Sequence, residues 1–258
     1  PGAFKHSLTA AAAAEAIMRG LRASSLELPL KSFPIADGGN GTLDAFLGHG
    51  GSRIALPVRD PLGRKIEAAY GILSDGRTGV IEMALASGLE LVEKPDALSA
   101  STYGTGELIR AALDTGVSRI IVGMGGSATT DGGAGCLQAL GLRLLDSEGN
   151  DIPPGGGGLV YLDHVDASGL HDKLKTTEII IAADVDSPAV GANGAAAVFG
   201  PQKGASDRDV ALLDAALVRW FGVISDVTGR GVVDIPGSGA AGALAGGIMA
   251  FANARIQS

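Results

Sequence analysis

Hydrophobic residues recur at helical spacing in several stretches of the chain. The first stretch follows Ser7, a good helix N-cap, and places Leu8, Ala14, Ile17 and Leu21 on one face. The same spacing predicts helices over residues 42–47, 102–115 and 207–220, a helix that ends at residue 140, and a tightly packed Gly/Ala-rich helix over residues 239–254.

Shorter apolar runs between these helices predict strands. Residues 53–92 form a β-rich insert without long helices, and residues 119–123 are a continuous apolar run typical of a buried parallel strand. Strands are expected over residues 32–36, 54–58, 66–73, 80–83, 119–123 and 178–183. This alternation predicts an α/β fold, and the length of 258 residues is compatible with two domains built from discontinuous segments.

Glycine-rich loops lie where predicted strands hand over to helices, at residues 37–41, 104–106 and 123–135. Small residues there let backbone N–H groups approach an anion, and a helix N-terminus adds partial positive charge. One such loop is better explained by a tight turn without a ligand. Three in one chain favour binding of a phosphate or a carboxylate.

A dinucleotide-binding fingerprint is an alternative explanation of the loop after residue 123. Gly123-x-Gly125-x-x-Ala128 fits its spacing, and Asp146 lies at the distance expected for a ribose-binding acid. Asp131 and the pair of glycines after it fall in the supposed helix, where each glycine costs about 1 kcal/mol. A nicotinamide-dependent oxidoreductase therefore remains a second hypothesis.

Carboxylates follow or end several predicted strands: Asp37, Glu82, Asp184 and Asp186. Phosphoryl transfer uses Mg²⁺ held by a few carboxylates, and a carboxylate to accept the alcohol proton. Each acid could instead cap a helix or solvate a loop. Lys5, just before a helix N-terminus, is placed to neutralise a phosphate, although on the sequence alone a solvated surface lysine is the better explanation.

Composition narrows the classes of function. Hydrophobic residues make up 46% of the chain and charged residues 19%, which is enough for a packed core, and glycine supplies 41 residues. The net charge of −8 without a basic run argues against nucleic-acid or anionic-membrane binding. One cysteine, Cys136, excludes an internal disulfide, and no signal-peptide pattern follows Pro1, so a reducing, cytoplasmic location is expected.

Six motifs in order along the chain resemble those of the bacterial glycerate kinase family. They are Phe4-Lys5 with Ser7-Leu8, and the segments 36–42, 81–89, 102–108, 125–133 and 199–204. The resemblance covers essentially the whole chain, and no P-loop or protein-kinase signature accompanies it.

The resemblance implies an ATP- and Mg²⁺-dependent transfer of the γ-phosphoryl group to D-glycerate, mainly to its 2-hydroxyl, giving 2-phosphoglycerate. It also implies two α/β domains, one with a Rossmann- or flavodoxin-like parallel sheet, and a site in the cleft between them. We assign residues 1–51 and 99–141, possibly with 236–258, to the Rossmann-like domain, and residues 52–98 and 142–235 to the second domain, which contains the β-rich insert. A homodimer is possible within this scheme.

Site residues follow from the motifs and from physical reasoning. Three are expected to be catalytic: Lys5, Asp37 and Asp131. Those expected to bind glycerate or nucleotide are Ser7, Gly38, Gly39, Thr42, Glu82, Thr105, Gly125, Gly126 and Ser127. Asp184 and Asp186 are the expected metal ligands.

The chain departs from the family pattern within the presumed site loops. Gly2 and Asn40 stand where the family usually has a carboxylate, and Ala3, His6 and Thr130 are further differences. The family pattern also leads us to expect a strand before Pro1 and a further Gly-rich motif after Ser258. A homologue that binds a small acid without phosphorylating it is thus the other alternative.

Overall fold

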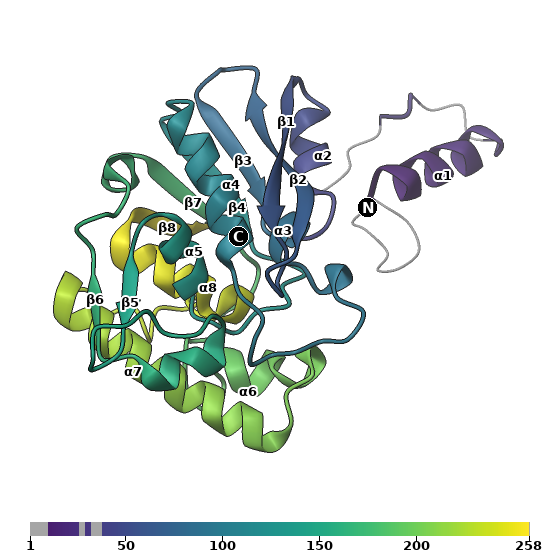
Figure 1. The fold of residues 1–258 in the computed structure, drawn as a ribbon. Helices are drawn as coiled ribbons and strands as arrows, with labels where there is room; N and C mark the ends of the chain where they lie inside the picture. The colour runs from purple at the N-terminus through teal and green to yellow at the C-terminus, as the bar shows by residue number, and fades with distance from the viewer. Residues whose placement is uncertain (1–9, 26–28, 32–37, 258) are drawn as a thin grey trace.

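The computed structural model describes residues 10–25, 29–31 and 38–257. The predicted strand over residues 32–36 and the predicted site residues Lys5, Ser7 and Asp37 lie outside the described residues. Figure 1 shows a central twisted sheet with helices on both faces, and α1 (Ala10–Arg22) to one side. None of the described helices is long and apolar enough to cross a membrane.

The sheet has six strands in the order β1-β2-β3-β4-β7-β8. The strands are β1 (Gly51–Arg59), β2 (Lys65–Leu73), β3 (Thr78–Glu82), β4 (Arg119–Gly123), β7 (Glu178–Ala182) and β8 (Asn253–Gln257). β1, β2 and β3 pair antiparallel, whereas β3, β4, β7 and β8 are parallel to one another. The mixed sheet confirms the predicted α/β class, with the antiparallel hairpin supplied by the β-rich insert.

Strand alternation divides the core between the two faces of this sheet. On one face Leu43 of α2 (Thr42–Leu47) packs with Ala69 and Val80. On the other, Tyr70 and Ile81 belong to the larger cluster beneath α4 (Tyr103–Asp114). Adjacent residues of one strand therefore serve different helices, as the period of two in a strand requires.

The remaining elements extend the larger core beyond the sheet. α7 (Asp207–Thr228) begins with a capping box at Ser206 and buries Trp220, and α8 (Ala240–Phe251) is buried along its whole length. The others are α3 (Ala84–Ser87), η1 (Leu89–Leu91), α5 (Ala134–Ala139), β5 (Arg143–Leu145), η2 (Gly156–Tyr161), β6 (His164–Asp166), η3 (Asp172–Lys175), α6 (Ala195–Phe199) and η4 (Pro201–Lys203). β5 and β6 form a separate antiparallel pair.

Two features correct the expectation of a plain helix over residues 239–254. Ala241, Gly242 and Ala243 have left-handed φ/ψ angles, so the segment starts with a left-handed turn. Its end also differs, because residues 253–257 leave the helix and join the sheet as β8. The left-handed turn is imposed by packing against other segments, and β8 forms by pairing with β7. Both are tertiary effects, which the local spacing of hydrophobic residues does not encode.

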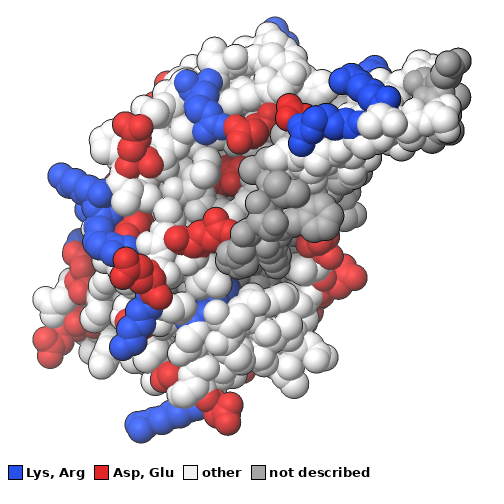
Figure 2. Space-filling model, turned by 90° about the vertical axis from the view of Figure 1, so that its right-hand side faces the viewer, with Lys and Arg blue, Asp and Glu red and all other residues white. Residues whose placement is uncertain are grey.

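Strands from both predicted domains share the one six-stranded sheet, since β1, β2, β3 and β7 come from the segments assigned to the second domain and β4 and β8 from the other. The division into two domains stays a prediction. Figure 2 shows one face of the molecule, on which acidic and basic side chains are interspersed and the described residues form no continuous basic patch.

Candidate active site

The carboxyl ends of the parallel strands meet at one edge of the sheet. Glu82 of β3 pairs with Gly123 of β4, Gly123 pairs with Ala182 of β7, and Ala182 pairs with Gln257 of β8. The chain therefore leaves β3, β4 and β7 at the same level, which is the usual position of ligand sites in open α/β sheets.

Two glycine loops pack backbone to backbone at this edge. The Gly125 N–H donates to the Gly38 carbonyl at 2.8 Å, and the Met124 N–H donates to the Ala182 carbonyl at 3.1 Å. A Cβ atom on Gly125 would lie 2.5 Å from the Cα of Gly39, and one on Gly38 would lie 2.4 Å from the Ala182 oxygen. Only glycine permits this approach. The structure thus brings together the predicted residues Gly38, Gly39, Gly125 and Gly126.

The loop after β4, residues 124–133, keeps many of its donors unpaired. Within the described part of the chain, the N–H groups of Gly126, Ser127, Thr129 and Thr130 make no hydrogen bond. Gly126 is exposed and Ser127 is half-buried, so their N–H groups lie near the surface. Unpaired N–H groups in a glycine-rich turn form a concavity suited to an anion.

Buried hydroxyl groups without partners belong to the same loops. Three buried side-chain oxygens of the described residues lack a hydrogen-bond partner: Oγ1 of Thr42, Thr129 and Thr130. Buried polar groups are normally paired, so such groups point to a missing water or ligand. Thr42 is a predicted binding residue, whereas sequence reasoning gave no role to Thr129 and treated Thr130 only as a departure from the family pattern.

Glu82 binds the glycine loop before α2. Its two carboxylate oxygens accept hydrogen bonds from the N–H groups of Gly41, at 3.1 Å, and Leu43, at 3.0 Å. Burial raises the pKa of this carboxyl, and the two hydrogen bonds oppose the rise. The first turn of α2 thus receives its cap from a different strand, and Glu82 shapes the site through the loop.

Asp131 is completely buried and engaged in hydrogen bonds. It accepts from the Thr102 N–H at 2.8 Å, from the Thr102 hydroxyl, and from the N–H groups of Gly133 and Gly135 at 3.1 and 3.2 Å. Burial raises the pKa of its carboxyl, against the effect of these bonds. The contacts join the N-terminal ends of α4 and α5, which favours a positioning role over direct contact with substrate.

Thr105 and Ser127 lie beside α3. The Thr105 hydroxyl is buried and shares a 2.7 Å hydrogen bond with the Ser87 hydroxyl. Ser127 lies opposite Gly88 in an isolated β-bridge, whose hydrogen bonds run from the Leu89 N–H to the Gly126 carbonyl at 2.8 Å and from the Ala128 N–H to the Ser87 carbonyl at 2.9 Å. Thr105 therefore supports the segment on which the β4 loop rests.

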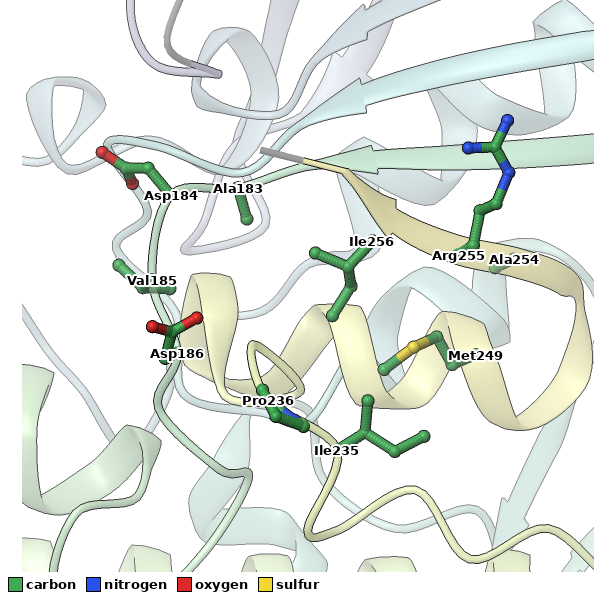
Figure 3. A pocket seen from close by; sticks show the side chains of 10 residues that line it. All are labelled: Ala183, Asp184, Val185, Asp186, Ile235, Pro236, Met249, Ala254, Arg255 and Ile256. Carbon is green, nitrogen blue, oxygen red and sulfur yellow. The ribbon is translucent and has the colours of Figure 1, made fainter.

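Asp184 and Asp186 stand on the segment that leaves β7, at the mouth of a hollow of about 660 Å³ (Figure 3). Its wall is largely apolar, with Ile235, Met249 and Ile256. Both aspartates are exposed, and neither forms a hydrogen bond or ion pair among the described residues. Two unpaired carboxylates fit Mg²⁺, which takes one or two carboxylates and completes its shell with phosphate oxygens and water.

The basic group in that hollow does not neutralise the two aspartates. Arg255 is bound instead to Glu178 and Gln257, at 2.8 and 3.0 Å, and in Figure 3 its guanidinium points away from them. The negative charge of Asp184 and Asp186 is thus available to a cation.

Lys203 is a buried group to which sequence reasoning assigned no individual role. It is 1% exposed, and its Nζ donates to the Thr129 carbonyl at 2.6 Å. Burial lowers the pKa of its ammonium to about 7, although the charge of Asp131 acts in the opposite direction. Its position inside the motif 199–204 was the available signal, but burial of a lysine cannot be inferred from a motif.

The family departure at position 40 also falls at this site. A Cβ atom on Gly126 would lie 2.7 Å from Oδ1 of Asn40, so the carboxamide rests against the β4 loop. Lys5 and Asp37 lie outside the described residues.

The structure does not favour the dinucleotide fingerprint. A helix should begin directly at the glycine turn to direct its N-terminus at a pyrophosphate. Here residues 124–133 are non-helical, and α5 begins only at Ala134.

Comparison with known proteins places the chain. The model of the glycerate kinase family matches residues 1–258. Glycerate 2-kinase of Escherichia coli is 48% identical over 262 residues, with 100% of this chain and 68% of that protein covered. Glycerate kinase of Bacillus subtilis is 46% identical, with 100% of this chain and 68% of that protein covered.

A solved structure agrees with these relatives. The crystal structure from Salmonella typhimurium LT2, described as a "putative glycerate kinase 2", is 46% identical and superimposes with a TM-score of 0.90. The match covers 100% of this chain and 70% of that one. These matches do not favour the oxidoreductase hypothesis. They confirm the resemblance in the motifs: the chain belongs to the glycerate kinase family.

Proposed function

We propose that this protein transfers the γ-phosphoryl group of ATP to the 2-hydroxyl of D-glycerate, giving 2-phosphoglycerate. Membership in a kinase family implies ATP as the phosphoryl donor. The observation that carries the proposal is the pair of apposed glycine loops. Within the described part of the chain, the N–H groups of Gly126, Ser127, Thr129 and Thr130 and the buried hydroxyls of the three threonines named above have no hydrogen-bond partner. Such donors suit the oxygens of a transferring phosphoryl group or of the glycerate carboxylate.

Each site residue has a role that follows from its position. The N–H groups of Gly126 and Ser127 stabilise charge on the transferring phosphoryl group, with Lys5 as the added cation. Asp37 directly precedes the Gly38 loop and accepts the proton of the glycerate hydroxyl or binds the metal. Glu82 and Asp131 hold the loops from beneath through their hydrogen bonds.

Asp184 and Asp186 would hold Mg²⁺ at the same edge of the sheet. The ion supplies charge neutralisation on the phosphate oxygens when bound. Both carboxylates are exposed and have no partner among the described residues, so they are free to bind a cation.

The decisive experiment measures ADP release with ATP, Mg²⁺ and D-glycerate, and identifies the phosphorylated carbon by NMR. We expect glycerate-dependent turnover at the 2-position. In Asp37→Asn, kcat/KM should fall at least about a hundredfold, which corresponds to ~2.7 kcal/mol. A change of only a few-fold would contradict the role of Asp37.

A thermal-shift measurement with glycerate alone separates the kinase from a homologue that only binds the acid. Stabilisation by glycerate without ADP release would support the binding homologue. The neutral Asn40 and Gly2, where the family usually has carboxylates, are the positions at which such a loss would arise.

A further inference from the structure

The loop after β4 is held by hydrogen bonds to other segments, among them those from the N–H groups of Gly125, Ala128 and Gly132 to the carbonyls of Gly38, Ser87 and Gly242. Among the residues that the structure describes, the N–H groups of Gly126, Ser127, Thr129 and Thr130 have no hydrogen-bond partner, and neither do the hydroxyls of both threonines. In the function proposed above these groups are kept for a ligand. Because these donors do not bind within the loop, contacts with other segments must hold the loop in position.

The Thr129 carbonyl receives such a contact. It is buried, and the Lys203 ammonium reaches it from η4, 74 residues further along the chain, at 2.6 Å. The backbone of α8 approaches the same oxygen, because a Cβ atom on Gly242 would lie only 1.9 Å from it. Lys203 and Gly242 thus fix one point between the unpaired donors of the loop.

Both contacts with the Thr129 carbonyl, from Lys203 and from the turn at Gly242, lower the stability of the folded protein. This cost indicates a functional role in addition to core packing. A buried ammonium loses its hydration, and Lys203 forms no ion pair with Asp131 or any other described acid. The turn beside Gly242 places Ala241 and Ala243 at φ angles of 55° and 67°, which are unfavourable for residues with a Cβ atom. Strain of this kind persists where surrounding structure imposes it, commonly at functional sites.

We propose that Lys203 is a positioning residue, which holds the Thr129 carbonyl so that the donors of the β4 loop stay arranged for the transferring phosphoryl group. The inference rests on the proposed kinase function for its catalytic consequence. The anchoring itself is independent of that function. Lys203 acts through Thr129 and is not assigned a contact with substrate.

The chain offers a matched control. Lys173 also donates from Nζ to a backbone carbonyl, that of Leu113, at 3.0 Å. Leu113 lies near the C-terminal end of α4, away from the glycine loops. Lys173 is exposed, so Lys173→Met removes a bond from a lysine to a backbone carbonyl outside the core and away from the site.

The test compares Lys203→Met, Lys203→Arg and Lys173→Met by hydrogen exchange and by kinetics. The amides of Ala128 and Gly132, which flank Thr129 and donate to Ser87 and Gly242, report on the loop. Trp220, the chain's one tryptophan, donates to the Gly132 carbonyl at 3.0 Å and gives a fluorescence signal from the same place.

We expect Lys203→Met to exchange these two amides at least tenfold faster and to lower kcat at least tenfold, with the KM for ATP changed less than threefold. Lys203→Arg, which keeps donor and charge, should recover part of both, and Lys173→Met should match the parent. Unchanged exchange in Lys203→Met would overturn the proposal. So would faster exchange with unchanged kcat, or equal losses in Lys173→Met.

Two outcomes are kept distinct from failure of the anchoring. If the parent protein releases no ADP, the proposed function fails, and the exchange data alone then decide whether Lys203 anchors the loop. If Lys203→Met does not fold, Lys203→Gln, which keeps a donor without the charge, replaces it. Exchange in that variant equal to the parent's would count against a need for the lysine.

Discussion

Two pairs of acids at the same edge of the sheet behave in opposite ways. Glu82 and Asp131 are buried, and their oxygens are occupied by N–H groups of the loops and helices around them. Asp184 and Asp186 are exposed and have no partner among the described residues. The first pair builds the site and the second is available to a ligand, so the position of an acid after a strand does not define its role.

The largest effect is expected from removing Asp131. Asp131→Ala leaves the donors of Thr102, Gly133 and Gly135 buried without an acceptor, at about 1 kcal/mol or more each. We expect the free energy of unfolding, measured with denaturant, to fall by at least ~3 kcal/mol. Asp184→Ala is the exposed control, with a change below ~0.5 kcal/mol. Similar losses in both variants would abolish the distinction between the two pairs.

For the exposed pair, Asp184 and Asp186, we expect the opposite result: a loss of activity with little change in stability. Asp184→Asn with Asp186→Asn should lower kcat/KM about a hundredfold at limiting Mg²⁺, or ~2.7 kcal/mol, because the carboxylates that hold the ion are lost. The unfolding free energy should stay within ~0.5 kcal/mol of the parent's. Asp226→Asn, an exposed acid of α7, serves as control. Retained activity at low Mg²⁺ would remove the metal site from the hollow.

A smaller effect is expected at Glu82, whose carboxylate serves two donors from the start of α2. Glu82→Gln keeps one acceptor oxygen, so the unfolding free energy should fall by about 1–2 kcal/mol. Hydrogen exchange at the Gly41 and Leu43 amides should become faster, while the Ala128 amide, which is bound to Ser87, stays protected. Equal exchange at all three amides would show that Glu82 does not act locally.

The sequence contained more information about the loops than about their support. Glycines where strands hand over to helices gave a local signal, and residues 38–41 and 123–133 do meet at the sheet edge. The different roles of Glu82 and Asp184 were not predictable from the sequence. Glu82 is occupied by donors that are distant in sequence, such as the N–H of Gly41, 41 residues away. Burial of Lys203 and the pairing of β8 depend likewise on distant partners.

The antiparallel part of the sheet shows the opposite balance. Its strands alternate in sequence, and β1 and β2 formed where the pattern placed them. Local hydrophobic spacing suffices for a hairpin, whereas a site assembled from four strand ends requires contacts that no local pattern specifies.

The smallest expected effect extends the contrast between buried and exposed charge to pH. Burial holds the pKa of Lys203 at about 7 in the folded protein, below the ~10.4 of an unfolded chain. Between these values the unfolded state binds more protons, so this group makes folding more favourable as pH rises and less favourable as pH falls toward 7. The charge of Asp131 raises the pKa of Lys203 against the effect of burial, and Asp131 is present in both proteins compared.

The measurement compares unfolding free energies at pH 7.0 and 8.0. The parent should gain on the order of 1 kcal/mol relative to Lys203→Met over this interval, because the variant has no buried amine to deprotonate. In the control variant Lys173→Met, which keeps Lys203, the unfolding free energy should change with pH as in the parent. If the unfolding free energies of the parent and Lys203→Met change with pH in parallel, the Lys203 ammonium keeps its proton in the folded state. Lys203 would then respond to pH as an exposed lysine does.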